Sequence, residues 1–370
     1  MKKLWKKVVA SLVIGVLTVG AAGCAKGETA SSGSTEVVTE DNVLSEQVDS
    51  TKEENNTDAT TEANETIHLR FGATGWKLYE SLLQAAGLDD FEGYEVEYFV
   101  FQGGNLCLEA LAADQIDFTT TSEIPPIAAS KSAGGGNFKI VLIGSSSPQN
   151  QEVVALETSG IKTIADLKGK KVGYIKNTTA HYFLNEMLKK EGLSWNDIEP
   201  VEITTADGVT ALIGGEIAAF ASYGNSINAA KANGAITIET AVNILSGNFP
   251  LEISETALQD EAKTEAIADY FARVQKAYEW AGNNLEEWAK IQAEPTGNTE
   301  EESLDLLQRT YNDRGYYYNL IGIDDNVIAS EQSVADALYE LKVLDDKTDV
   351  STFYDTSFYE KYQKALENLN

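Results

Sequence analysis

The polar residues 177–179 (Asn-Thr-Thr) stand between a short strand pattern at 171–175 and an amphipathic helix pattern that ends at Gly192. Threonine and asparagine side chains commonly cap a helix and leave its first backbone amides free. Free amides at the carboxyl end of a strand are where α/β proteins bind ligands. This block therefore predicts a cradle for a small anionic or strongly polar group.

The number and positions of the cysteines and histidines argue against a metal site and against nucleophilic catalysis. The chain has two of each, Cys24 and Cys107, and His68 and His181. The histidines stand on different expected elements, so neither a histidine-based zinc site nor a Cys/His nucleophilic site is expected. Cys107 stands among apolar residues of a helix pattern and indicates a buried thiol, without a disulfide partner if Cys24 carries lipid. We predict no metal and no cofactor.

The formal net charge of −30 at pH 7 bears on the partners. Such a charge repels nucleic acids and anionic membrane surfaces, and argues against both. It does not exclude a small anion, because salt screens surface fields beyond about 8 Å whereas amides at a helix end act at contact distance.

The first residues indicate export. Four lysines precede an apolar run at 8–19, a pattern typical of an export signal, and no other stretch is long and apolar enough to span a bilayer. The sequence Ala-Ala-Gly-Cys at 21–24 looks like a bacterial lipobox. Residues 1–23 are thus expected to be a lipoprotein signal peptide, and Cys24 to anchor the protein to the outer face of the cell membrane; secretion without lipid is the alternative. The polar residues up to 66 are expected to be a disordered acidic tether.

Beyond residue 67, strand patterns alternate with helix patterns over roughly 300 residues, which favours two lobes rather than one core. The alternation implies parallel pairing with right-handed crossovers. We expect the second lobe at 157–248, and the first at 67–156 and 249–370 with C-terminal helices. Two α/β lobes joined by two crossing segments form a hinged trap, with the ligand in the cleft between them.

The order of these segments resembles substrate-binding proteins of ABC importers, in the branch for aliphatic sulfonates, taurine and nitrate. The resemblance rests on FQGGNLCLEAL at 101–111, IDFTTTSEIPP at 116–126, the block 161–193 and the helical tail from about 262, and it covers almost all of 67–345. It implies a two-lobed α/β fold of the type II periplasmic-binding-protein class. It also implies a monomer that captures a small anionic or zwitterionic solute by lobe closure and delivers it to a membrane permease.

The resemblance further implies which loops line the cleft. Their residues are Thr74, Gly75, Trp76, Thr121, Ser122, Glu123, Asn177, Thr178, Thr179, Ala180, His181, Tyr223 and Asn225. Where many relatives have Trp-Asp-Pro and an aromatic residue, residues 223–226 read Tyr-Gly-Asn-Ser. This departure changes the apolar wall and leaves the sulfonate specificity open.

Several of these residues also have a purely structural interpretation. Thr178 can simply cap the helix, Glu123 can complement a helix N-terminus, and His181 can face solvent instead of donating to an anion. The tyrosines at 316–318 are expected to pack a helix rather than line a site. For the function, the alternatives are a pyrimidine-like heterocycle as the cargo, or a sensory lipoprotein. An enzyme is not expected, because no acid partner for His181 is evident from spacing.

Overall fold

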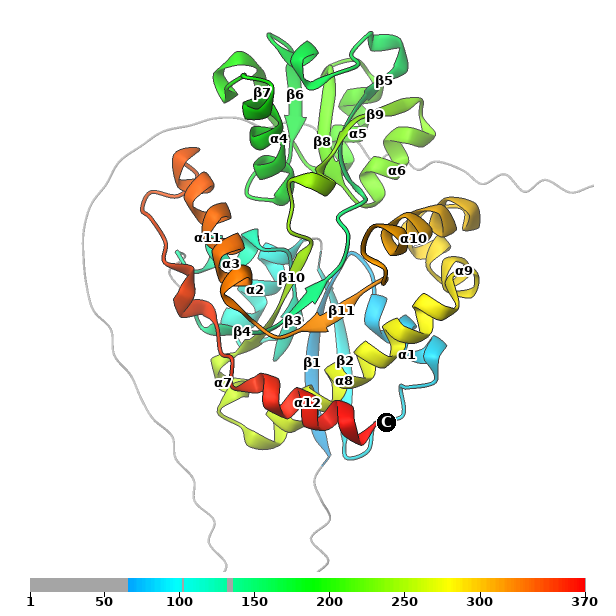
Figure 1. The fold of residues 1–370 in the computed structure, drawn as a ribbon, viewed down its shortest axis with the longest axis vertical. Helices are drawn as coiled ribbons and strands as arrows, with labels where there is room; N and C mark the ends of the chain where they lie inside the picture. The colour runs from blue at the N-terminus through cyan, green and yellow to red at the C-terminus, as the bar shows by residue number, and fades with distance from the viewer. Residues whose placement is uncertain (1–65, 102, 132–135, 370) are drawn as a thin grey trace, which may run out of the picture. The chain divides into compact units, whose positions relative to one another are not determined.

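The computed structural model describes residues 66–101, 103–131 and 136–369. The predicted signal peptide, Cys24 and almost all of the tether lie outside these ranges. The described residues contain two β-sheets with the strand orders β11-β4-β10-β3-β1-β2 and β7-β6-β8-β5-β9 (Figure 1). Helices cover both sheets, so the predicted two-lobed α/β class is confirmed, with one sheet in each lobe.

The first lobe is built on β1 (Ile67–Thr74), β2 (Tyr94–Phe101), β3 (Phe118–Thr120), β4 (Phe138–Ser145), β10 (Asn248–Ser254) and β11 (Asn319–Ile321). Strand β1 runs parallel to β2 and β3, as predicted. Strand β10 runs antiparallel to β3 and β4, and β11 runs antiparallel to β4, so purely parallel pairing was wrong. The reason is that β10 enters this sheet from the second lobe, without the crossover helix that a parallel neighbour needs.

The second lobe is built on β5 (Gln151–Leu156), β6 (Lys171–Tyr174), β7 (Glu199–Glu202), β8 (Ala219–Tyr223) and β9 (Ala235–Thr240). Strand β6 is parallel to β7 and β8, whereas β5 is antiparallel to β8 and β9. Residues 151–156 were expected in the first lobe, and this pairing corrects that boundary. An apolar strand pattern shows that a strand is buried, but it does not show in which sheet.

The helices divide unequally between the lobes. The first lobe carries α1 (Leu78–Ala86), α2 (Gly104–Ala112), α3 (Ile124–Ala129), α7 (Glu255–Leu258), α8 (Glu261–Asn283), α9 (Leu285–Thr296), α10 (Glu300–Arg314), α11 (Asp325–Glu340) and α12 (Phe358–Asn368). The second carries α4 (Thr179–Lys190), α5 (Thr205–Ile213) and α6 (Asn225–Ala232). Short 3₁₀ turns span 157–159, 164–167, 195–197, 241–243 and 350–353. In the described ranges, no helix has the length and apolar character needed to cross a membrane.

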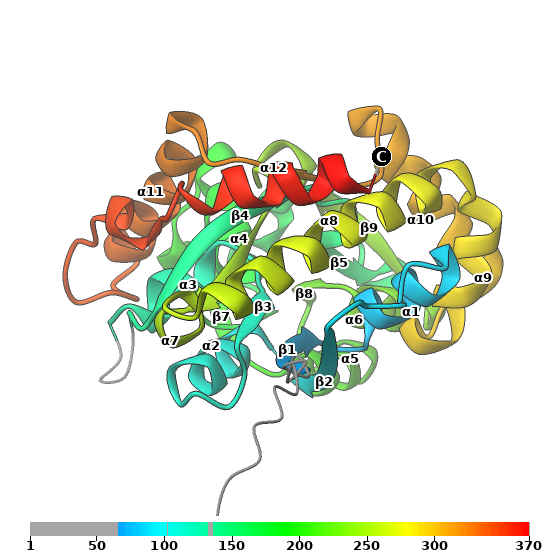
Figure 2. The same ribbon diagram turned by 90° about the horizontal axis from the view of Figure 1, so that it is seen from below.

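Aromatic packing joins the first sheet to α8. The Tyr270 ring on α8 lies 5.9 Å from the ring of Phe71 on β1 and 5.2 Å from that of Phe118 on β3. Helix α12 lies beside α8 (Figure 2), and Lys361 of α12 donates to Glu265 of α8 at 2.9 Å. The long C-terminal helices therefore pack on the sheet that carries the first half of the cleft.

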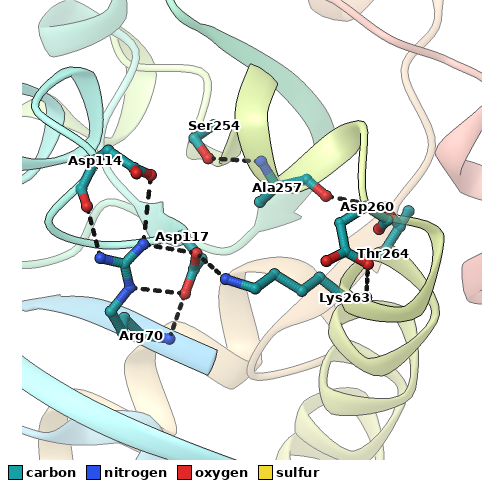
Figure 3. A network of polar contacts seen from close by, with 8 residues as sticks. All are labelled: Arg70, Asp114, Asp117, Ser254, Ala257, Asp260, Lys263 and Thr264. Carbon is teal, nitrogen blue, oxygen red and sulfur yellow. Dashed lines mark hydrogen bonds and ion pairs between the residues drawn. The ribbon is translucent and has the colours of Figure 1, made fainter. Parts of the chain in front are cut away.

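A buried carboxylate ties three elements of the first lobe together (Figure 3). Asp117, only 1 % exposed, accepts from the Arg70 guanidinium on β1 at 2.9 and 3.1 Å and from Lys263 on α8 at 2.7 Å. Burial acts to raise the pKa of Asp117, but the hydrogen bonds from Arg70 and Lys263 outweigh burial and lower it. The ion network thereby anchors α8 to the β1–β3 pair.

Candidate functional site: a cavity between the lobes

Two crossing segments, residues 146–150 and 244–247, connect the sheets and lie side by side (Figure 1). The Ser146 amide donates to the Gly247 carbonyl at 3.0 Å. Gly247 has φ +77°, and a Cβ there would lie 2.0 Å from the Ser146 oxygen, so only glycine fits. The C-terminal region holds both segments: Arg314 donates to the Ser246 carbonyl at 2.6 Å, and Ser147 donates to Asp313 at 2.5 Å.

A cavity of about 440 Å³ lies beside these segments, with walls from both lobes. Of the residues predicted to line the cleft, the following do line this cavity: Thr74, Trp76, Thr121, Ser122, Asn177, Thr178, Thr179 and Tyr223. Among the lining residues in the described part of the chain there is no Asp, Glu, Lys, Arg or His. The walls therefore offer hydroxyls, amides and aromatic rings instead of charges.

The second-lobe wall is the start of α4. Thr178 is the helix cap: its hydroxyl accepts the Ala180 amide at 3.2 Å and donates to the Ile175 carbonyl at 2.7 Å. The Thr179 hydroxyl donates to the Gln151 side chain on β5. The predicted cap is confirmed for Thr178. Thr178 and Thr179 also line the cavity, so the residue that caps α4 is at the same time part of the cavity wall.

The first-lobe wall brings the start of α2 against the loop before α3. A Cβ on Gly104 would lie 3.1 Å from the Thr121 side chain and 3.0 Å from Pro125, so the glycine permits this close approach. At the start of α2 the amides of Leu106 and Cys107 donate to the Gly103 carbonyl, and the amides before them have no carbonyl partner within the helix. Thr121 is hydrogen-bonded to Glu252, which is buried beneath it. Burial raises the pKa of Glu252 well above its usual range and so favours the neutral carboxyl.

Trp76 combines a place in the cavity wall with a packing contact inside the first lobe. It lines the cavity, and its ring also stacks on Trp288 of α9 with centroids 6.1 Å apart. Burial raises the pKa of Tyr223, on the opposite wall, which keeps its hydroxyl neutral.

Glu123 does not line the cavity. Its carboxylate accepts from Ser246 at 2.7 Å, from Ser330 at 3.2 Å and from Asn248 at 3.4 Å. Although Glu123 stands just before α3, its side chain makes no capping hydrogen bond to that helix. It instead supports the second crossing segment, and burial raises its pKa. Glu123 is close in sequence to the cleft loops, which suggested that it lines the cleft, but the fold places it outside the cavity wall.

The structure also places His181 elsewhere. It is 4 % exposed and packs against Tyr174 and Trp195, with ring centroids 4.8 and 4.9 Å away. Its Nδ1 has no hydrogen-bond partner among the described residues, and burial lowers its pKa to about 4. His181 is thus a neutral core residue, and the expectation that it faces solvent was wrong.

Three further predicted residues lie beside the wall without forming it. Ala180 is fully buried in the second-lobe core. Gly75 and Asn225 are each adjacent in sequence to lining residues, but they do not line the cavity themselves.

Two parts of the cavity wall were not predicted from the sequence. One is the first crossing segment, whose Ser146, Ser147 and Asn150 face the cavity. The other is aromatic and includes Tyr317 and Tyr318, which lie between α10 and β11; both rings pack on Tyr278 of α8, as expected, but they also line the cavity. The signals were a polar run, Ser-Ser-Ser-Pro-Gln-Asn, between two strands, and three tyrosines directly after a helix-ending glycine.

The predicted thiol burial is confirmed, because Cys107 is 0 % exposed and free. Its Sγ lies 3.6 Å from the Thr74 hydroxyl, and burial raises its pKa. The described ranges contain no group of three or more His, Cys, Asp or Glu side chains placed to hold a metal ion.

Known proteins match this chain over most of its length. A candidate aliphatic sulfonates-binding protein of Escherichia coli (strain K12) is 28% identical over 269 residues, 69% of this chain and 78% of that protein. A protein of the same description from Bacillus subtilis (strain 168) is 27% identical over 75% of this chain and 80% of its own length. These matches confirm the resemblance to substrate-binding proteins that the sequence motifs indicated.

Solved structures agree on the fold. The periplasmic aliphatic sulphonate binding protein of Escherichia coli superposes with a TM-score of 0.69 at 24% identity, over 80% of this chain and 99% of that one. The model of the family described as NMT1/THI5 like matches residues 85–287, which is more than half of the chain. The chain therefore belongs to the NMT1/THI5-like family.

Proposed function

We propose that this protein is an extracytoplasmic solute-binding protein that captures a small organic anion, with an aliphatic sulfonate as the first candidate. The ligand is held between the lobes and delivered to an ABC permease, and the chain is anchored through a lipid on Cys24. The observation that carries the proposal is a cavity between two connected lobes whose described walls present neutral hydrogen-bond donors. The sulfonate-binding relatives support this choice of ligand.

Neutral donors suit an oxyanion. The start of α2 and the start of α4 both face the cavity, and helix N-termini stabilise negative charge through free amides. The Ser122 hydroxyl and the side-chain amides of Asn105 and Asn177 add donors of the kind that form strong hydrogen bonds to ionised oxygens. Micromolar affinity corresponds to about 8 kcal/mol, which a few such bonds and one apolar wall supply after the cost of closure.

The composition of the same cavity walls favours binding of the ligand without a chemical reaction. A hydrolase or transferase needs a nucleophile and a base within reach of the substrate. The described lining residues offer hydroxyls but no His, Cys, Asp, Glu or Lys to activate one of them. Binding is therefore the function that this lining supports.

Thermal unfolding with a ligand panel tests the proposal. The full exported chain with Cys24→Ser, which prevents lipidation, is melted with methanesulfonate, butanesulfonate, taurine, nitrate, sulfate and a pyrimidine. A sulfonate at a hundred times its dissociation constant should add about 2.7 kcal/mol of stability. If the pyrimidine alone stabilises the chain, the sulfonate proposal is wrong and a heterocycle is the cargo.

A further inference from the structure

Six of the side chains that line the cavity form an aromatic cluster in the first lobe. We call this cluster the aromatic chamber and define it by Phe71, Tyr79, Phe249, Tyr278, Tyr317 and Tyr318, all of which line the cavity. They come from β1, α1, β10, α8 and the segment before β11, so distant parts of the first lobe converge there. The donor-bearing loops of α2 and α4 line the same cavity.

The aromatic chamber is held in place by its own packing. Tyr278 and Tyr318 stack with centroids 4.2 Å apart and planes 18° apart, and the hydroxyls of Tyr79 and Tyr318 lie 3.4 Å apart. Tyr318 lies directly over Gly144 of β4, where a Cβ would come within 1.6 Å of its hydroxyl. A wall fixed before the ligand arrives costs little ordering on binding.

The chemistry of the aromatic chamber suits an apolar or aromatic group. Burial raises the pKa values of Tyr278 and Tyr318 well above the usual range, so their hydroxyls stay neutral. Aromatic rings bury large apolar areas and stack on other rings at 4.5–7 Å. The volume of about 440 Å³ also lies in the range of pockets for organic molecules, which is roughly 300–1,000 Å³. Nitrate or sulfate would leave most of this space to water.

We infer that, among organic sulfonates, the preferred ligand is not a purely aliphatic one but one whose tail carries an aromatic ring. The sulfonate group is bound by the loops of α2 and α4 and the tail occupies the aromatic chamber. This inference rests on the proposed function. The proposed function assigns the sulfonate group of the ligand, and the inference assigns its tail.

Calorimetric titration of the Cys24→Ser chain separates the two ideas. The probes are methanesulfonate, taurine, 4-toluenesulfonate and naphthalene-2-sulfonate, with a pyrimidine as the uncharged ring. We expect the two aryl sulfonates to bind at least tenfold more tightly than methanesulfonate and taurine. Equal affinities, or tighter binding of taurine, would overturn the aromatic tail and leave the proposed function standing. Absence of binding by every sulfonate would overturn both.

A variant pair checks that the aromatic chamber binds the tail. Phe249→Ala should weaken naphthalene-2-sulfonate at least tenfold and methanesulfonate less than twofold. Tyr339→Ala removes an exposed aromatic residue on α11, away from the cavity, and should change neither affinity. If Phe249→Ala does not fold, Phe249→Leu keeps an apolar side chain and should weaken the aryl ligand about threefold. An equal loss for both ligands in the folded variant would contradict the assignment.

Discussion

At the scale of single residues, the site relies on side chains with two roles. Thr178 caps α4 and also faces the cavity, so its substitution affects stability and binding together. Thr299 offers a comparison, because its hydroxyl also caps a helix, α10, by accepting a backbone amide (from Glu302, at 3.2 Å), but it lies outside the cavity wall. The pair allows the two roles to be measured separately.

We expect Thr178→Ala and Thr299→Ala each to lose about 1 kcal/mol of unfolding free energy, the usual cost of a lost cap. Only Thr178→Ala should also weaken sulfonate binding, by about tenfold, because the Thr178 hydroxyl is bonded to the Ile175 carbonyl and the Ala180 amide and so holds the start of α4 in place at the cavity wall. Chemical denaturation and calorimetry give the two quantities. Unchanged affinity in Thr178→Ala would remove this residue from the binding site.

Asp117 supports a prediction about stability and pH. Asp117→Asn leaves Arg70 and Lys263 without their buried partner, and should cost about 3 kcal/mol at neutral pH. The folded pKa of Asp117 is lowered, so its contribution is present above the unfolded pKa near 4 and is lost as the pH falls through the folded value. The stability gap between the wild-type chain and Asp117→Asn should therefore shrink in acid. A gap that is constant with pH would show that the charge of Asp117 is not the cause.

At the scale of elements, sequence patterns correctly predicted the features that depend on contacts between residues close in the sequence. The strand–loop–helix order of residues 171–190 and the cap at Thr178 depend on neighbours in the sequence, and both are confirmed. The sheet that receives β5 depends on its pairing with β8 and β9, which no local pattern records. Strands β9 and β11 were not predicted at all. The aromatic chamber was missed for the same reason, because its members converge only after folding.

The crossing segments carry a prediction at this scale. Gly247→Ala places a methyl group against the Ser146 oxygen in addition to straining a left-handed φ, and should lower the melting temperature markedly. Gly297→Ala is the matched control, with φ +72° and no atom within 4 Å of the added Cβ, so it should cost only about 1 kcal/mol. Equal losses in the two variants would show that contact between the crossing segments is unimportant.

At the scale of the whole molecule, a ligand between two lobes should act on their separation. We expect the ligand that stabilises the chain to reduce its radius of gyration in small-angle X-ray scattering, because closure buries the cavity walls. Thr299→Ala should show the same reduction at a saturating ligand concentration. A radius that does not change on binding would mean that the ligand enters a cleft that is already closed.

The hydrogen bonds between the C-terminal region and the crossing segments have a consequence beyond the cavity. Arg309 in α10 donates to Gln149 at 3.0 Å, and Ser147 and Ser246 are bonded to Asp313 and Arg314 at the end of the same helix. If the lobes close on the ligand as we propose, a helix bonded to the crossing segments has to shift or strain when these segments turn. The position of the outer face of α10 would then depend on whether the ligand is bound, and a membrane partner could recognise that position without contacting the ligand.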